Sequence, residues 1–187
     1  MIRAFLATAA IAAICVVAAV LGPRQAPGGT ITARKVADVV LKDDRGRPYR
    51  FADIPPNGSV VLMGYTRCGD QCPLAMARAT LAVAGLPPAN RPRIVFLTID
   101  PAHDTVADLR RFTSMWAVPV VGVTGSTKNI EHAVASLGSV MPSPAALSIH
   151  DSRVAFVAPD GEVRASVGPD ASDATVSAAL RSIGDLP

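Results

Sequence analysis

The sequence is poor in aromatic residues, cysteines and histidines, and each shortage narrows what the protein can be. Aromatic residues make up 4% of the 187 residues, although half of all residues are hydrophobic. We therefore expect a core of Val, Ala, Leu and Ile. The chain is long enough for one domain with a substantial core and an appendage. Three cysteines are too few for a small domain held together by several disulfides.

The chain also lacks any block of basic residues with interleaved aromatics. Its formal net charge of +3 is small and spread along the sequence, so nucleic-acid binding is not predicted. Sixteen prolines and fourteen glycines alternate with apolar runs. That pattern indicates many tight connections and not disorder.

An uncharged N-terminal run predicts a membrane anchor. Arg3 is followed by residues 4–22, which carry no charge, and then by Pro23 and Arg24. A helix over this run extends about 28 Å, close to the apolar thickness of a bilayer. The run exceeds the roughly 7–15 residues usual for a signal peptide, and no clear cleavage site ends it. We expect one uncleaved transmembrane helix within residues 1–24, in which Cys15 has no predicted chemical role.

Two further segments complete the expected organisation. Residues 25–38 contain Pro and Gly without apolar periodicity, which predicts a tether. Residues 39–187 are expected to form the folded domain. Arg3 is the only charge before the span, which favours a cytoplasmic N-terminus. The expected location is a bacterial-type inner membrane, crossed once, with the domain facing the periplasm.

Apolar runs and turn residues predict alternating strands and helices after residue 39. Strands are expected at residues 39–41, 48–51, 59–63, 93–99, 119–123, 145–149, 154–157 and 163–167, and helices at 74–84, 106–116, 127–137 and 173–183. This order fits a central mixed sheet with helices on both faces. A strand that ends in a cysteine pair at a helix start is the thioredoxin-type arrangement. We therefore predict an α/β, thioredoxin-like fold.

Cys68 and Cys72 carry the strongest chemical signal, because they lie between a predicted strand and a predicted helix. Backbone N–H groups and the positive dipole end of a helix favour thiolate at such a position. Residues four apart on a helix have Cβ atoms about 5–6 Å apart, which allows either a disulfide or a shared metal ion. Two thiolates select Cu(I), or zinc when further ligands join them. An inert disulfide is the alternative without chemistry.

A histidine is the natural third ligand, and the chain has three of them. His132 falls at a polar position of a predicted helix. His103 follows a predicted strand, in a loop that also precedes a helix, and His150 comes at the end of another predicted strand. Composition and spacing do not choose among them.

The segment around the two cysteines resembles the hallmark segment of the Sco family (SenC/PrrC type), membrane-anchored copper-binding proteins of cytochrome c oxidase assembly. The resemblance extends from about residue 39 to the C-terminus. The matching segments are Gly64-Tyr65-Thr66-x-Cys68-x-Asp70-x-Cys72-Pro73, Thr98-Ile99-Asp100-Pro101-x-x-Asp104-Thr105, Gly122-Val123-Thr124-Gly125-Ser126, and His150 followed nine residues later by Pro159-Asp160-Gly161.

This resemblance implies a copper site and a role for it. The implied ligands are Cys68, Cys72 and His150, which suit Cu(I) and Cu(II) alike. The implied partners are the copper-receiving subunit of cytochrome c oxidase and other copper carriers or thiol reductants. Gly69 stands where the family usually has proline, which predicts a more flexible loop, and Ile149 stands where the family commonly has aspartate before the histidine.

Two functions compete for the same cysteines. The first is copper delivery for oxidase assembly, which is not primarily enzymatic. The second is a thiol–disulfide oxidoreductase, in which Cys68 or Cys72 attacks a partner disulfide and the other resolves it. A peroxiredoxin-type peroxidase is disfavoured, because Thr66 lies two residues before Cys68 and not three. A purely structural or signalling module would need no thiols at a helix start.

Overall fold

The structure is a computed structural model of the chain and describes residues 34–149 and 152–184. The predicted anchor (residues 1–24), most of the predicted tether (25–38) and His150 lie outside the described residues. Within the described ranges, no helix combines the length and the apolar character needed to cross a bilayer.

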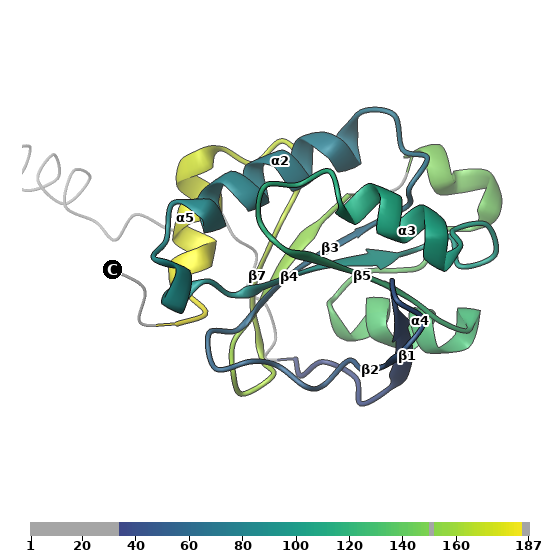
Figure 1. Cartoon of the computed structure of the whole chain (residues 1–187), viewed down its shortest axis with the longest axis horizontal. Helices are drawn as coiled ribbons and strands as arrows, with labels where there is room; N and C mark the ends of the chain where they lie inside the picture. Colours follow the sequence, from purple (N-terminus) through teal and green to yellow (C-terminus); the bar gives the residue numbers. More distant parts are fainter. Residues whose placement is uncertain (1–33, 150–151, 185–187) are drawn as a thin grey trace, which may run out of the picture. The chain divides into compact units, whose positions relative to one another are not determined.

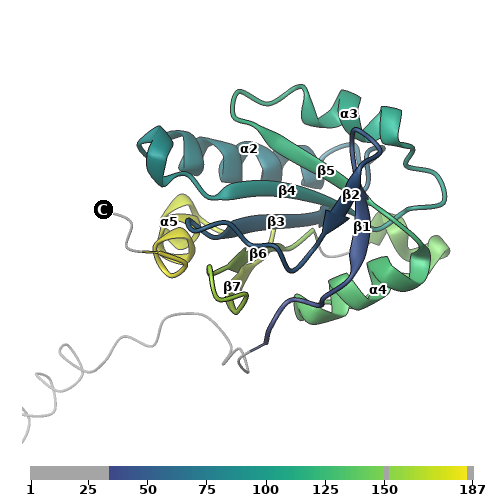
Figure 2. The same cartoon turned by 60° about the horizontal axis from the view of Figure 1, so that its bottom comes forward.

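A mixed sheet runs through the middle of the domain, and seven strands form it in the described part of the chain (Figure 1). Their order is β2-β1-β5-β4-β3-β6-β7, which places β3 and β4 near the centre (Figure 2). The three strands β3, β4 and β5 are parallel, and all other pairs are antiparallel. The strands are β1 (Val40–Asp43), β2 (Pro48–Arg50), β3 (Ser59–Gly64), β4 (Arg93–Thr98), β5 (Val120–Thr124), β6 (Val154–Val157) and β7 (Val163–Val167).

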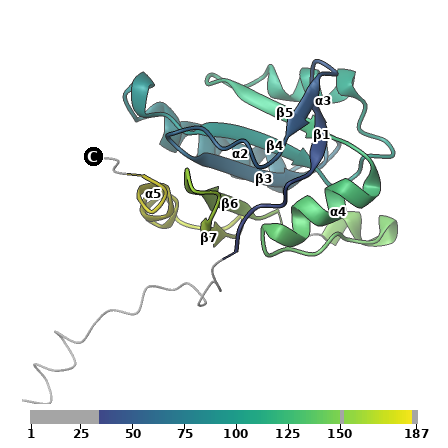
Figure 3. The ribbon, with the colours of Figure 1, turned by 90° about the horizontal axis from the view of Figure 1, so that it is seen from below.

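Helices cover both faces of this sheet. One face packs against α2, α3 and α5, and the other packs against α4. Viewed from below, α4 lies in front of the sheet and away from α5 (Figure 3). The helices are α2 (Gln71–Ala84), α3 (Val106–Thr113), α4 (Thr127–Ser136) and α5 (Asp173–Arg181), with short 3-10 helices η1 (Pro88–Asn90) and η2 (Pro144–Ile149). The predicted mixed α/β architecture is therefore confirmed.

The alternation of side chains along β3 divides the core into two layers. Val60 and Leu62 pack in the cluster beneath α2, whereas Val61 and Met63 pack in the cluster above α4. Successive strand residues point to opposite faces, and every residue of β3 is buried. A strand covered on both faces reads as a continuous apolar run, which is why its position was predictable.

The predicted strand at residues 145–149 is wrong. This segment forms the 3-10 helix η2, and the next strand is β6. A short apolar run does not distinguish a strand from a helical turn by periodicity. Pro144 is suited to the first position of a helical turn, and Ala145, Ala146 and Leu147 favour helix over strand.

The predicted helix at residues 106–116 is shorter than expected. α3 ends at Thr113, with Ser114 at its C-cap, so Trp116 lies beyond the helix. Trp116 is half-buried and still packs against the core, where its ring lies edge-on to that of Phe112 with 5.8 Å between centroids. The apolar spacing therefore identified the buried residues Leu109 and Phe112, but it did not locate the end of the helical backbone.

Phe96 gives a test of this two-layered core. Its side chain is fully buried in β4, and its ring centroid is 4.4 Å from that of Phe112. We expect Phe96→Ala to lower the free energy of unfolding by about 3–5 kcal/mol, through lost burial and a residual cavity. Leu81→Ala removes an apolar side chain that is 72% exposed on α2, and it should change stability by no more than about 0.5 kcal/mol. Urea unfolding of both variants measures the difference, and equal losses would contradict the assigned core.

Candidate metal centre

The two cysteines lie at the carboxyl end of the central strand β3, where it leads into α2. α2 begins at Gln71, just before Cys72 and three residues before the predicted start at residue 74. The Asp70 side chain accepts a hydrogen bond of 2.6 Å from the Gln71 N–H at the start of the helix. Pro73 falls in the first turn of the helix, where its missing N–H has no intrahelical partner to lose. The carboxyl ends of parallel strands are a usual position for binding sites.

Neither Cys68 nor Cys72 forms a disulfide, and both are buried, Cys72 completely and Cys68 with 9% of its surface exposed. The backbone N–H of Cys72 donates to the Cys68 sulfur over 3.4 Å. One of the unsatisfied N–H groups of the helix N-terminus is thus directed at Cys68. The pair therefore consists of an outer thiol at the helix end and an inner thiol beneath it.

Gly64 provides the space that the inner thiol occupies. A Cβ at this position would lie 2.6 Å from the Cys72 sulfur and 3.2 Å from both Leu62 and Phe96. No real Cβ atom tolerates the first of these distances, so β3 must end in glycine for Cys72 to sit against it. Gly69, within the cysteine loop, has no atom within 4 Å of a Cβ built on it. The two glycines therefore have different structural roles.

Burial acts against the thiolate form at Cys72. Desolvation raises the pKa of the Cys72 thiol from its ordinary value of 9.0 to about 12, and the nearby Cys68 adds to the rise. Hydrogen bonds with Ser152 and with the Tyr65 backbone act in the opposite direction but do not offset it. The expectation that the helix start lowers thiol pKa values is thus wrong for Cys72, because its sulfur lies inside the core and not in front of the helix.

Ser152, in the segment that precedes β6, contacts the inner thiol of Cys72. Its side chain is fully buried, and its Oγ lies 3.5 Å from the Cys72 sulfur. The position is fixed by the sheet, because the Met63 N–H donates to the Arg153 carbonyl and Val154 pairs with Leu62. Two segments 80 residues apart in sequence therefore meet at one sulfur atom.

Asp104 connects the cysteine loop to β4. Its carboxylate is 2% exposed and accepts three hydrogen bonds. These come from the Thr66 N–H at 3.0 Å, the Thr66 hydroxyl at 2.6 Å and the Thr98 hydroxyl at 2.6 Å. A buried carboxylate is tolerated when its acceptor sites are occupied in this way. The backbone two residues before Cys68 is thus fixed to the end of the neighbouring strand.

A second buried carboxylate, Asp100, joins the loop to His103. One Asp100 oxygen lies 2.5 Å from Arg67 Nη2, and the other lies 2.7 Å from His103 Nδ1. The imidazole is 60% exposed. His103 therefore pairs with a carboxylate beside the cysteine loop. His132 is exposed on α4, which covers the other face of the sheet.

An open hollow adjoins the cysteine loop on the side of α3. Its volume is about 490 Å³. Polar and apolar side chains line it together, namely Thr66, Arg67, His103, Asp108, Arg111, Phe112 and Met115. The loop that carries Cys68 is therefore accessible from this side.

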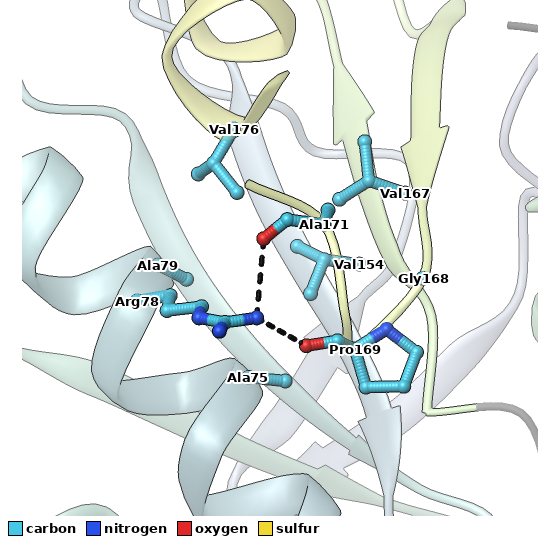
Figure 4. Close-up of a pocket in the computed structure, with 9 residues that line it drawn as sticks. All are labelled: Ala75, Arg78, Ala79, Val154, Val167, Gly168, Pro169, Ala171 and Val176. Atoms are coloured by element: carbon cyan, nitrogen blue, oxygen red, sulfur yellow. Dashed lines mark hydrogen bonds between the residues drawn. The ribbon is translucent and has the colours of Figure 1, made fainter. Parts of the chain in front are cut away.

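Arg78 fixes α2, the helix that carries Cys72, to the connection between β7 and α5. Its Nη1 donates to the carbonyls of Pro169 at 2.6 Å and Ala171 at 3.1 Å (Figure 4). The crevice beneath it has a volume of only about 10 Å³, so it is a packing defect at most one water in size. This contact holds the helix and offers no room for a ligand.

The described residues contain part of the predicted ligand set. They bring Cys68 and Cys72 together, but residues 34–149 and 152–184 contain no group of three or more His, Cys, Asp or Glu side chains placed to hold a metal ion. His150, the third ligand that the resemblance implies, lies outside the described residues. The donor chemistry of two adjacent thiols outside any disulfide fits a soft metal ion.

The sequence predicted no supporting role for Gly64, Arg67, Asp104 or Ser152, although Gly64 and Asp104 belong to the segments that resemble the Sco family. For Arg67 and Asp104 a physical signal also existed, because they follow apolar runs that form neighbouring parallel strands. The carboxyl ends of such strands meet at one edge. For Ser152 there was no signal, since nothing in its local sequence indicates contact with a cysteine 80 residues away.

Comparison with known proteins identifies similar chains. The family model described as SCO1/SenC matches residues 29–184. A Stutzerimonas stutzeri protein provisionally named as copper-binding is 25% identical over 143 residues, which are 72% of this chain and 69% of that protein. The chain spans only 36–39% of the length of the mitochondrial SCO2 homologues of mouse, human and cattle that it matches.

Two solved structures share the fold. The crystal structure of yeast Sco1 with copper bound has a TM-score of 0.65 at 18% identity, and the match covers 79% of this chain and 90% of that one. BsSco, described as a Sco-family cytochrome c oxidase assembly protein with a disulfide switch, has a TM-score of 0.63 at 21% identity, over 79% and 94% of the two chains. At these identities the likeness establishes the fold.

The close approach at Gly64 leads to a test with a matched control. We expect Gly64→Ala to displace Cys72 and to lower the free energy of unfolding of the reduced protein by about 1–3 kcal/mol, because the core is overpacked. Gly69→Ala introduces the same methyl group four residues before Pro73, where a Cβ meets open space, and should cost less than about 0.5 kcal/mol. Urea unfolding under reducing conditions measures both, and an equal effect of the two variants would refute the contact.

The raised pKa of Cys72 predicts a dependence of stability on pH. Between its ordinary pKa of 9.0 and the folded value of about 12, the folded protein keeps a proton that the unfolded chain releases. The stabilisation from Cys72 is therefore complete below pH 9.0 and declines as the pH rises toward about 12. From about pH 8 to about pH 10, the reduced protein should lose roughly 1 kcal/mol more than Cys72→Ser does. Urea unfolding at the two pH values checks this, and parallel losses would contradict it.

Proposed function

The chain belongs to the SCO1/SenC family, and from this premise we propose that it is a copper carrier for the assembly of the copper centre of cytochrome c oxidase. Copper is bound by Cys68, Cys72 and His150 and is passed to the copper-receiving oxidase subunit. The relatives support this proposal, since one is provisionally named for copper binding and another was solved with copper bound. BsSco is described as belonging to a family of oxidase assembly proteins.

One observation carries the choice of ligands, namely the contact between Ser152 and Cys72. The Ser152 Oγ lies 3.5 Å from the Cys72 sulfur, and Cys68 receives the Cys72 N–H. Ser152 follows His150 by two residues, a length of chain that spans at most about 7 Å. This supports His150 as the third ligand in preference to His103, which is paired with Asp100, and to His132 on α4.

The donor set suits an ion that must be bound and then released. Two thiolates favour Cu(I), and an added imidazole accommodates Cu(II). Three protein ligands leave coordination positions open, through which a receiving ligand can bind before the carrier's ligands leave. Because ligands bind metal in their deprotonated form, copper entry displaces the proton that burial keeps on Cys72.

The proposal includes a location. Residues 1–24 serve as a single transmembrane anchor and residues 25–38 as a tether. The domain of residues 39–187 then faces the periplasm, beside a membrane-embedded oxidase. Partners that load copper or reduce the cysteine pair act on the same side.

A thiol–disulfide oxidoreductase is the second candidate, and the arrangement of the two thiols favours it. Cys68 lies at the helix N-terminus and directly follows Thr66 and Arg67, which line the open hollow, whereas Cys72 is fully buried. In this function Cys68 attacks a disulfide of the oxidase subunit, and Cys72 resolves the mixed disulfide. The subunit's cysteines are left reduced and ready for copper.

Copper binding by purified protein separates the two functions. We expect one copper ion per chain and a sulfur-to-Cu(II) charge-transfer band. Cys68→Ser, Cys72→Ser and His150→Ala should each lose at least about tenfold in copper affinity, as expected when one of three ligands is removed. His103→Ala and His132→Ala are the matched controls and should bind copper as the wild type does.

The opposite pattern supports the oxidoreductase. If His150→Ala leaves both copper affinity and spectrum unchanged, the proposed ligand set is wrong. Reduction of a partner disulfide that needs both cysteines, yet proceeds normally in His150→Ala, would then identify thiol exchange as the function.

A further inference from the structure

A buried hydroxyl contacts the inner cysteine from outside the cysteine loop. We propose that Ser152 is a positioning residue for Cys72: it donates a hydrogen bond to the Cys72 sulfur and so sets the dithiol–disulfide equilibrium of the cysteine pair and the strength with which this sulfur donates to copper. The copper part of this proposal, the effect on the sulfur's donation to copper, rests on the proposed function. The redox part, the effect on the dithiol–disulfide equilibrium, does not.

The contact is held rigidly from both sides. Ser152 directly precedes Arg153, whose carbonyl accepts from Met63 in β3 and whose guanidinium bonds Ser166 in β7 at 2.9 Å. Cys72 lies in the first turn of α2, in the space left by Gly64. A hydrogen bond between two positions fixed by regular structure is already formed before any reaction occurs. Ser152 is therefore preorganised to contact the sulfur.

The direction of the hydrogen bond follows from the chemistry of the sulfur. In the neutral pair either atom can donate across the 3.5 Å separation. When Cys72 binds copper or attacks a disulfide, its sulfur is a thiolate and has no proton. Only the Ser152 hydroxyl can then donate. The reactive forms of Cys72 thus always accept the bond from Ser152.

This bond favours the reduced pair over the disulfide. Oxidation of Cys68 and Cys72 by glutathione disulfide forms one S–S bond, and the two electrons and two protons pass to glutathione disulfide, which becomes two molecules of glutathione. The sulfur of a disulfide accepts hydrogen bonds weakly, so the bond from Ser152 is largely lost on oxidation. Toward copper, the same bond withdraws electron density from the sulfur, as hydrogen bonds to metal-bound thiolates do.

Ser152→Ala tests the redox part, with Ser59→Ala as a matched control. Ser59 is as deeply buried, and its hydroxyl has no hydrogen-bond partner in the described structure. It begins β3 at the opposite end from Gly64. In glutathione buffers, Ser152→Ala should shift the equilibrium of the pair toward the disulfide by roughly two- to tenfold, as expected for the loss of one hydrogen bond. Ser59→Ala should match the wild type.

Two results would overturn the proposed effect of Ser152 on the dithiol–disulfide equilibrium. The first is a wild-type equilibrium in Ser152→Ala, and the second is an equally large shift in Ser59→Ala. Circular dichroism and thermal unfolding of each reduced variant establish that the comparison is made between folded proteins. Replacement of a serine by alanine removes a single oxygen atom, so both variants are expected to fold.

Cu(II) spectra test the copper part. Without the bond from Ser152 the Cys72 sulfur donates more strongly, so the sulfur-to-Cu(II) band of Ser152→Ala should move to lower energy, while that of Ser59→Ala should not move. An unmoved band in Ser152→Ala overturns the copper part. Absence of copper binding by the wild type overturns the proposed function instead, and the glutathione equilibrium then decides the role of Ser152 alone.

Discussion

The position of β3 between β4 and β6 is the constraint on which the site depends. Its parallel pairing with β4 places the carboxyl ends of both strands together, so Asp104 can hold Thr66 of the cysteine loop. Its antiparallel pairing with β6 brings the residues before β6 to the same end, where Ser152 meets Cys72. The cysteine loop is thus supported from two strands that flank its own, and neither support is available to an isolated loop.

The two sulfurs of the cysteine pair have different surroundings. The Cys72 N–H, at the N-terminus of α2, donates a hydrogen bond to the Cys68 sulfur. Burial keeps the proton on Cys72, whose pKa rises to about 12. The pair therefore has two distinct members, an outer sulfur in a residue that keeps 9% of its surface exposed and an inner sulfur that becomes charged only when an ion or a reaction compensates for its desolvation. Such a difference suits both the binding of copper and the exchange of disulfides.

Much of the fold could be predicted because its signals are local. The buried runs of β3 and β4 lie where apolar runs predicted strands, at residues 59–63 and 93–99. The two wrong predictions of secondary structure also arose from local sequence signals. Residues 144–149 form a 3-10 helix, since a short apolar run fits both a strand and a helical turn. Trp116 packs against the core without helical backbone, because the spacing of apolar residues and the hydrogen-bonding pattern of the backbone are separate properties.

The sequence by itself determined the cysteine spacing, the strand-to-helix junction around it and the family, because each depends on neighbouring residues. Only the tertiary structure decided the surroundings of each sulfur. Gly64 leaves the space for Cys72, Ser152 supplies its hydroxyl, and desolvation reverses the expected direction of its pKa shift. These contacts join residues from different strands and a helix, and the pKa of a buried group depends on what surrounds it in space. Neither these contacts nor this pKa can be predicted from the local sequence.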